Sequence, residues 1–180
     1  MIVGDRVNKG WDICGRLRGM AARARFVVGS RCYLSGDVRG ARRWAEGPAA
    51  GGDGRCRLLL GLCLYDEICE DLSGEQGMEK LAAACRMMEE LERLEALDHR
   101  LAYLACMHLA LVYRSAGESI RPPGIARDLE KARGFVARAA ALPGIQGQNA
   151  RRELMRYGRG RDGTLFYSGF SSSALERQRP

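Results

Sequence analysis

The sequence of residues 101–117 is LAYLACMHLALVYRSAG, and that of residues 128–140 is DLEKARGFVARAA. In both segments apolar and small side chains recur every three or four residues, as they do along one face of an α-helix. Gly117 and the Pro-Pro-Gly run at residues 122–124 separate the segments with turn-forming residues. The pair therefore predicts two helices joined by a turn. The characteristic positions are Ala105, Leu109, Ala110, Tyr113, Gly117, Asp128, Lys131, Ala132, Phe135, Ala139 and Ala140.

Two earlier stretches repeat this pattern less completely. The first consists of Ala24, Val28, Gly29, Tyr33, Gly36, Ala41, Trp44, Ala49 and Ala50. The second opens with Cys56, Leu60, Gly61 and Tyr65 and returns through Glu79, Lys80, Leu81 and Ala84. In each, a small residue stands four positions before an apolar residue that is followed directly by glycine or alanine. Two helix backbones can approach closely there, while the apolar side chain fills the adjoining groove.

Together the three stretches resemble Sel1-like repeats, a branch of the tetratricopeptide superfamily. The pattern of that family places Ala, Leu-Gly, Tyr and Gly on a first helix, and Lys-Ala, an aromatic residue and Ala-Ala on a second. The run from Asp128 to Ala140 matches the second helix without a gap, and the resemblance covers roughly residues 20–157. It implies a short right-handed α-solenoid of about three antiparallel helix pairs. It also implies packing roles for the aromatic residues Tyr33, Tyr65, Tyr113, Trp44 and Phe135.

The copies differ in detail from the family pattern. The tyrosine stands one residue late in the first two copies, and the return helix of the second copy has no aromatic residue. The copies begin 32 and then 49 residues apart. We expect a long helix over residues 77–99, opened by a capping box of Ser73 and Gln76, to account for the longer interval.

Glycine and proline divide the chain into lengths that suit helices, and β-branched residues are sparse between the divisions. The sequence therefore predicts an all-α fold, with helix pairs and no sheet over most of residues 15–157. We expect one helical repeat domain over residues 1–157. The main divisions lie at residues 36–37, 51–54, 73–74, 121–124 and 143–144.

Residues 158–180 form a segment rich in glycine, arginine and serine, which predicts a flexible tail. Phe166, Tyr167 and Phe170 are unusual in such a segment. They could form a short recognition segment or fold back as a cap on the last helix, and we favour the cap.

The amino-terminal residues carry charges where a secretory signal would need an apolar stretch. The longest apolar run, residues 58–65, is far shorter than the roughly 18 residues that span a bilayer. These features predict a soluble cytoplasmic protein.

The seven cysteines are odd in number and scattered along predicted helices, which favours reduced thiols packed as small apolar groups. Structural zinc sites use cysteines two to four residues apart, whereas the closest pair here is Cys63 and Cys69. We expect no metal site and no cofactor.

The chain has only two histidines, His99 and His108, and no recognised catalytic motif surrounds either. The adjacent carboxylates Asp66-Glu67 and Glu89-Glu90 are interpreted as a solvated face, because neighbouring residues on a helix diverge. The sequence favours a protein that is not an enzyme.

Charge is distributed in three blocks, and 26 of the 29 basic residues are arginine. The net charges of residues 1–57, 58–98 and 99–180 are +7, −8 and +8. In a solenoid these blocks would become bands along the molecule that steer charged partners. Nucleic acid is an unlikely partner, because the acidic middle block would repel a continuous phosphate backbone.

The functional hypothesis is a scaffold or adaptor that binds a partner protein or peptide. The resemblance implies binding on the concave surface lined by the first helix of each pair, where Arg25, Arg57 and His108 occupy similar positions. Guanidinium groups there would favour an acidic partner. The alternatives are a secretion chaperone or an immunity-type inhibitor of the same fold, a nucleic-acid-binding protein, and an enzyme without a recognised motif. The oligomeric state and the identity of the partner stay open.

Overall fold

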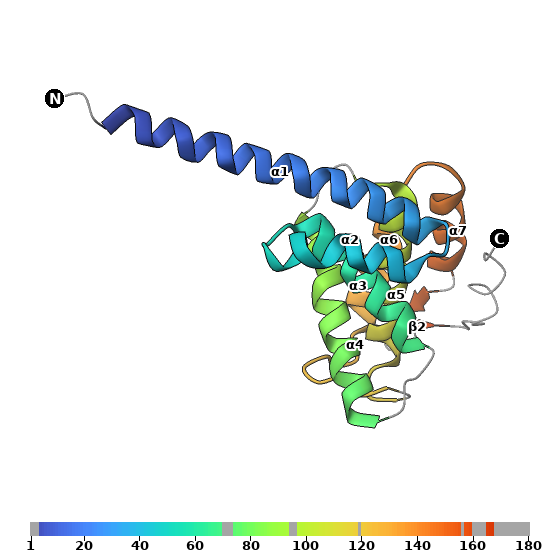
Figure 1. Cartoon of the computed structure of the whole chain (residues 1–180). Coiled ribbons are helices and arrows are strands. Elements are labelled where there is room, and N and C mark those ends of the chain that lie inside the picture. The colour runs from blue at the N-terminus through green and yellow to red at the C-terminus, as the bar shows by residue number, and fades with distance from the viewer. Residues whose placement is uncertain are drawn as a thin grey trace. The chain divides into compact units, whose positions relative to one another are not determined.

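The computed structural model describes residues 4–69, 74–93, 97–118, 120–155, 157–159 and 165–167, and within these ranges the protein is built almost entirely of α-helices (Figure 1). The prediction of an all-α fold is therefore confirmed. The chain forms two compact units, residues 1–97 and residues 98–180. This division was not among those expected from the sequence.

The helices pack mainly against their neighbours in the chain: α1 on α2, α2 on α3, α3 on α4, and in the second unit α5 on α6 and α6 on α7. The helices of the first unit are α1 (Gly4–Leu34), α2 (Val38–Ala50), α3 (Gly54–Cys69) and α4 (Gly74–Met88), followed by the 3-10 helix η1 (Glu89–Arg93). Those of the second unit are α5 (His99–Ser115), α6 (Leu129–Ala140) and α7 (Gly144–Leu154).

Two of the helix joints use the same glycine-aspartate pair. Gly36 and Gly52 both have φ +89°, a left-handed conformation that glycine adopts without strain and that ends the preceding helix. Each is followed by an aspartate that caps the next helix. The Oδ1 atom of Asp37 accepts a hydrogen bond from the amide of Gly40, and that of Asp53 accepts one from the amide of Cys56, both at 2.8 Å.

The first unit is organised around the close approach of α1, α2 and α3. Ala41 and Ala45 on α2 are fully buried, and a Cβ atom at Gly29 of α1 would lie 3.3 Å from the Ala41 carbonyl oxygen and 2.9 Å from Leu59 of α3. Only residues without bulky side chains permit this separation. The predicted contact at Gly29 is therefore present.

An equivalent contact joins α3 to α4. A Cβ atom at Gly61 would lie 2.9 Å from the carbonyl oxygen of Ala84 and 2.9 Å from the Cβ atom of Met87. Because α3 packs on α1, α2 and α4, it is apolar on nearly all sides, as expected of a central helix. Its fully buried side chains are Cys56, Leu58, Leu59, Leu62 and Cys63.

In the second unit, two of the aromatic residues that were predicted to pack, Tyr113 and Phe135, meet between α5 and α6. The rings of Tyr113 and Phe135 stack with their centroids 6.0 Å apart, and the Nζ atom of Lys131 donates a hydrogen bond of 2.7 Å to the Tyr113 hydroxyl. Asp128 caps α6 through the amide of Lys131. The hairpin that best matches the repeat pattern is thus closed by residues of that pattern.

The predicted long helix over residues 77–99 is wrong. The α-helix ends at Met88 and gives way to the 3-10 helix η1, and His99 is the first residue of α5, capped by Asp98. Ser73, half of the predicted capping box, lies outside the described residues. Trp44 also differs from expectation, because it is 42% exposed, although its Cβ atom lies beside Gly29.

A short antiparallel ribbon follows the last helix. Strand β1 (Tyr157–Arg159) pairs with strand β2 (Leu165–Tyr167), and β2 contacts α6. This pairing was not predicted from the sequence, which indicated a flexible tail. Phe170 lies outside the described residues.

We expect Gly29→Leu and Gly61→Leu each to lower the free energy of unfolding by about 1–3 kcal/mol or more, because the added side chain must displace packed helices. The matched control is Gly134→Ala on α6, where a Cβ atom would meet nothing within 4 Å. It should raise stability by about 0.5–1 kcal/mol. Urea unfolding followed by circular dichroism measures all three, and unchanged midpoints for both leucine variants would contradict the close contacts.

Candidate partner-binding surface

The structure places Arg25 on the exposed surface of α1, near the end of α2 and the start of α3. A Cβ atom at Gly47 of α2 would lie 3.2 Å from the Arg25 Nη1 atom. The positive charge of Arg25 also acts to lower the pKa of Cys56, the third residue of α3. Arg25 therefore stands where three helices meet, with its guanidinium group accessible from solvent.

Arg57 lies on α3 and already has a protein partner. Its Nη1 atom is 3.0 Å from the Oε1 atom of Glu90 in η1, and the two side chains are 42% and 15% exposed. Its charge is thus partly balanced within the first unit. A carboxylate ligand at Arg57 would have to share the guanidinium group with Glu90 or displace it.

His108 lies in the interior of the second unit and does not line an exposed surface. Its residue surface is 7% exposed, and desolvation by burial lowers the pKa of the imidazole from 6.5 to about 4. The side chain is therefore neutral at pH 7. Of the three residues proposed from the sequence, Arg25 and Arg57 are exposed in part on helices that pack together, and His108 is enclosed.

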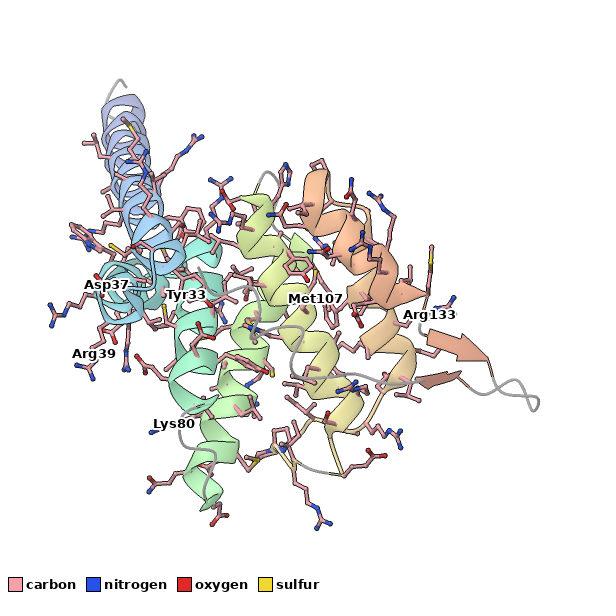
Figure 2. The ribbon with its side chains drawn as sticks, turned by 90° about the vertical axis from the view of Figure 1, so that its right-hand side faces the viewer. Tyr33, Asp37, Arg39, Lys80, Met107 and Arg133 are labelled. Atoms are coloured by element: carbon pink, nitrogen blue, oxygen red, sulfur yellow. The ribbon has the colours of Figure 1, made fainter. Side chains whose placement is uncertain are left out.

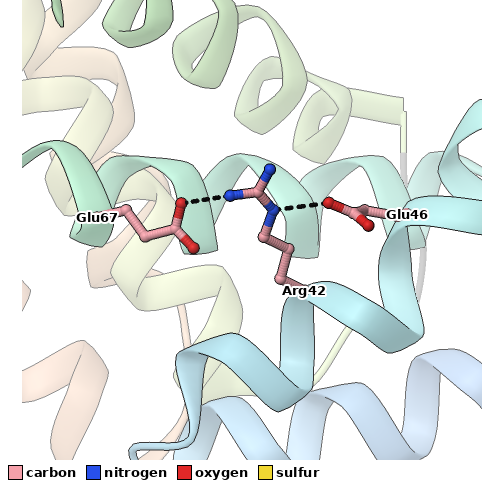
Figure 3. Close-up of polar contacts among 3 residues, drawn as sticks. All are labelled: Arg42, Glu46 and Glu67. Atoms are coloured by element: carbon pink, nitrogen blue, oxygen red, sulfur yellow. Dashed lines mark hydrogen bonds and ion pairs between the residues drawn. The ribbon is translucent and has the colours of Figure 1, made fainter.

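A polar network that the sequence analysis missed ties the first three helices together. The Tyr33 hydroxyl donates a 2.7 Å hydrogen bond to Asp66 on α3, and Figure 2 shows Tyr33 near the junction of α1 with α3. Arg42 of α2 lies between two carboxylates, at 2.7 Å from Glu46 and 2.7 Å from Glu67 (Figure 3). The hydrogen bond to Glu46 is the main cause of a raised pKa of Arg42.

The interpretation of Asp66-Glu67 and Glu89-Glu90 as a merely solvated face is therefore wrong. Asp66 and Glu67 accept hydrogen bonds from other helices, and Glu90 pairs with Arg57. The energetic contribution of the Arg42 pairs is small, because their side chains are one-third to one-half exposed to a screening solvent.

The buried thiols are poorly suited to nucleophilic chemistry. Burial raises the pKa of Cys56, Cys63 and Cys106 to about 12, so almost none is present as thiolate at neutral pH. Within the described ranges, no group of three or more His, Cys, Asp or Glu side chains is arranged to hold a metal ion. No helix in that same part of the chain is long and apolar enough to cross a membrane.

Comparison of the chain with protein-family models, with curated proteins and with solved structures gave no match.

The burial of His108 predicts a specific loss of stability in mild acid. The unfolded chain binds a proton below about pH 6.5, whereas the folded chain resists protonation until about pH 4. The free energy of unfolding therefore has its full value above pH 6.5. It decreases by up to about 3 kcal/mol as the pH falls towards 4. Urea unfolding at several pH values should show a shallower pH dependence for His108→Gln than for the wild type.

His99→Gln provides the matched control, because it makes the same substitution at an exposed position of α5 and leaves the buried core unchanged. The comparison uses the slope of the unfolding free energy against pH rather than its absolute value, because His108→Gln also changes the packing of the core. Parallel slopes for His108→Gln and the wild type would rule out the buried neutral imidazole as the cause.

The thiols predict an order of chemical labelling. Cys56, Cys63 and Cys106 should react with iodoacetamide only when the protein unfolds, whereas the half-buried Cys32 should be modified earlier in the native state. Peptide mapping by mass spectrometry reports each site separately, and labelling in urea shows that every thiol can react. Equal native rates for Cys32 and Cys56 would refute the predicted order.

Proposed function

We propose that the protein is a cytoplasmic scaffold or adaptor built as a short right-handed solenoid of three Sel1-like helix pairs, which binds an acidic segment of a partner protein. The pairs are α1 with α2, α3 with α4, and α5 with α6. The support comes from a contact that recurs between helices, together with the charges next to it.

The recurring contact carries the proposal. Gly29 faces the carbonyl oxygen of Ala41 and the Cβ atom of Trp44. Gly61 likewise faces the carbonyl oxygen of Ala84 and the Cβ atom of Met87. In both pairs the facing residues are three apart on the second helix, so the two glycines meet equivalent points of their partners. Met87 thus stands where the family pattern asks for an aromatic residue, which moves the second copy's return helix three residues along from the sequence alignment on Lys80 and Leu81.

The third pair repeats this arrangement in its sequence. Ala110 on α5 corresponds to the two glycines, and Ala132 and Phe135 on α6 are again three residues apart. All three residues are buried. Two close contacts of the same kind, and a third helix pair with the same residue spacing, support a repeat array rather than a single irregular bundle.

Repeat arrays use the aligned surfaces of successive helices to bind partners. Arg25 and Arg57 supply positive charge on the first helices of two successive pairs. A carboxylate-bearing peptide complements both, since guanidinium groups bind carboxylates in a paired geometry. The buried thiols and His108 take part in packing in this proposal.

The test begins with affinity capture of a partner and its identification by mass spectrometry. Arg25→Ala combined with Arg57→Ala should then weaken the purified complex by about 2–4 kcal/mol where both contacts become desolvated. Added salt should weaken the wild-type complex as well. Isothermal titration calorimetry measures both effects.

The control variant combines Arg43→Ala with Arg86→Ala, which removes two exposed arginines from the second helices α2 and α4. It lowers the net charge by the same amount and should leave the affinity within about twofold of the wild type. If both double variants reduce affinity equally, only the total charge matters and the proposed surface is wrong.

A further inference from the structure

Helix α1 has two apolar faces, although only one of them packs against the first unit. Phe26, Gly29, Ser30 and Tyr33 are buried and point towards α2 and α3. At 100° per residue, a second set lies about opposite to them. We call this set the outer face of α1, and it consists of Leu17, Met20, Ala24, Val27 and Val28.

The outer face is exposed along its whole length. Leu17 is 59% exposed, Met20 69% and Val27 43%, so these large apolar side chains lie mostly in water. Together with Ala24 and Val28 they recur at intervals of three and four residues and form a stripe roughly 16 Å long, or about three helical turns. Contiguous apolar patches of this kind on a soluble protein mark interaction sites.

The equivalent face of other first helices is covered. By the repeat alignment, Ala24 corresponds to Cys56 on α3 and to Ala105 on α5, and both are fully buried. The Sγ atom of Cys56 lies 3.8 Å from the Ala22 carbonyl oxygen of α1, so α1 itself covers that face of α3. The outer face of α1 therefore has the composition of a helix-packing surface. Ala24 is exposed, whereas the residues aligned with it on α3 and α5 are buried.

Charge around the stripe distinguishes between occupants. Arg23 projects from one edge of the stripe, and Arg31 stands at its carboxyl-terminal end; both are exposed, whereas Arg25 on the other edge lies against Gly47 of α2. No acidic residue occurs between Asp12 and Asp37 in the sequence. A second copy of α1 on this face would place arginines against arginines, whereas glutamates or aspartates on a partner would pair with them.

We propose that the outer face of α1 binds an amphipathic helix of a partner protein, with apolar residues at i, i+3 or i+4, and i+7 and acidic residues that pair with Arg23 and Arg31. A helix fits because the stripe is straight, narrow and three turns long, as in helix-in-groove recognition. This inference rests on the proposed function in assuming a protein partner, but it uses the side of α1 that faces away from α2 and α3.

The test uses the full chain and two synthetic helical peptides with leucine at i, i+3, i+7 and i+10. Glutamate fills the flanking positions of one peptide and lysine those of the other. Fluorescence anisotropy should show that only the glutamate peptide binds, and that raising the salt from about 0.05 to 0.3 M weakens its binding. Equal binding of both peptides, or binding of neither, would overturn the proposal.

Met20→Asn combined with Val27→Asn should weaken binding of the glutamate peptide at least about tenfold, because the peptide then loses its apolar contact. The melting temperature should change little, since both side chains are exposed. The control combines Ile145→Asn with Met155→Asn in the second unit, where the two side chains are 66% and 84% exposed. It should bind the peptide like the wild type, and equal losses in both variants would overturn the proposal.

Two further measurements test whether a second copy of the chain or a lipid surface covers the outer face instead. Sedimentation that shows a dimer lost in Met20→Asn, Val27→Asn would assign the face to a second copy and overturn the proposal. Binding to vesicles of phosphatidylglycerol and phosphatidylcholine that is lost in the same variant would assign it to a lipid surface, with the same result.

The proposed function can be separated from this inference in one experiment. A captured partner whose affinity falls with Arg25→Ala, Arg57→Ala but not with Met20→Asn, Val27→Asn would leave the proposed function intact and overturn the role of the outer face. The converse result would support the outer face and overturn the proposed binding surface at Arg25 and Arg57.

Discussion

The close approach of helix backbones at Gly29 and Gly61 is the constraint on which the first unit depends. With no side chain at these positions, α2 and α4 can pack so near that backbone carbonyl groups of one helix lie against Cα atoms of the other. Leu59 and Met88 then fill the space beside the contacts. The hydrogen bonds from Tyr33 to Asp66 and from Arg42 to Glu67 form at the margin of this packing and depend on the helix positions that it sets.

Local spacing in the sequence was sufficient to predict the helix pairs, because small residues, turn glycines and capping aspartates act within a few positions of each other. It was insufficient at the end of α4. Met88 and Leu91 are three residues apart and both buried, and that interval suits a 3-10 helix as well as an α-helix. The apolar pattern was therefore correct as far as Leu91, while the type of helix and its extension to residue 99 were wrong.

The candidate surface was harder to predict, since it depends on contacts between distant segments. Arg57 meets Glu90 because α3 packs on both α4 and η1, and nothing near Arg57 in the sequence indicates this pairing. His108 has the periodicity of its neighbours on α5, but periodicity does not distinguish a side chain facing a groove from one enclosed on all sides. The exposure of Leu17 and Met20 likewise depends on which helices cover α1.

The glycine-aspartate joints at Gly36-Asp37 and Gly52-Asp53 bear on how such a chain can lengthen. Each joint holds both the residue that ends one helix and the residue that caps the next, so α2 lies between two self-sufficient boundaries. A gene segment cut and rejoined at these boundaries would carry with it both the glycine that ends one helix and the aspartate that caps the next. Helices can then be inserted or removed by recombination without new capping residues having to evolve in the neighbouring segments.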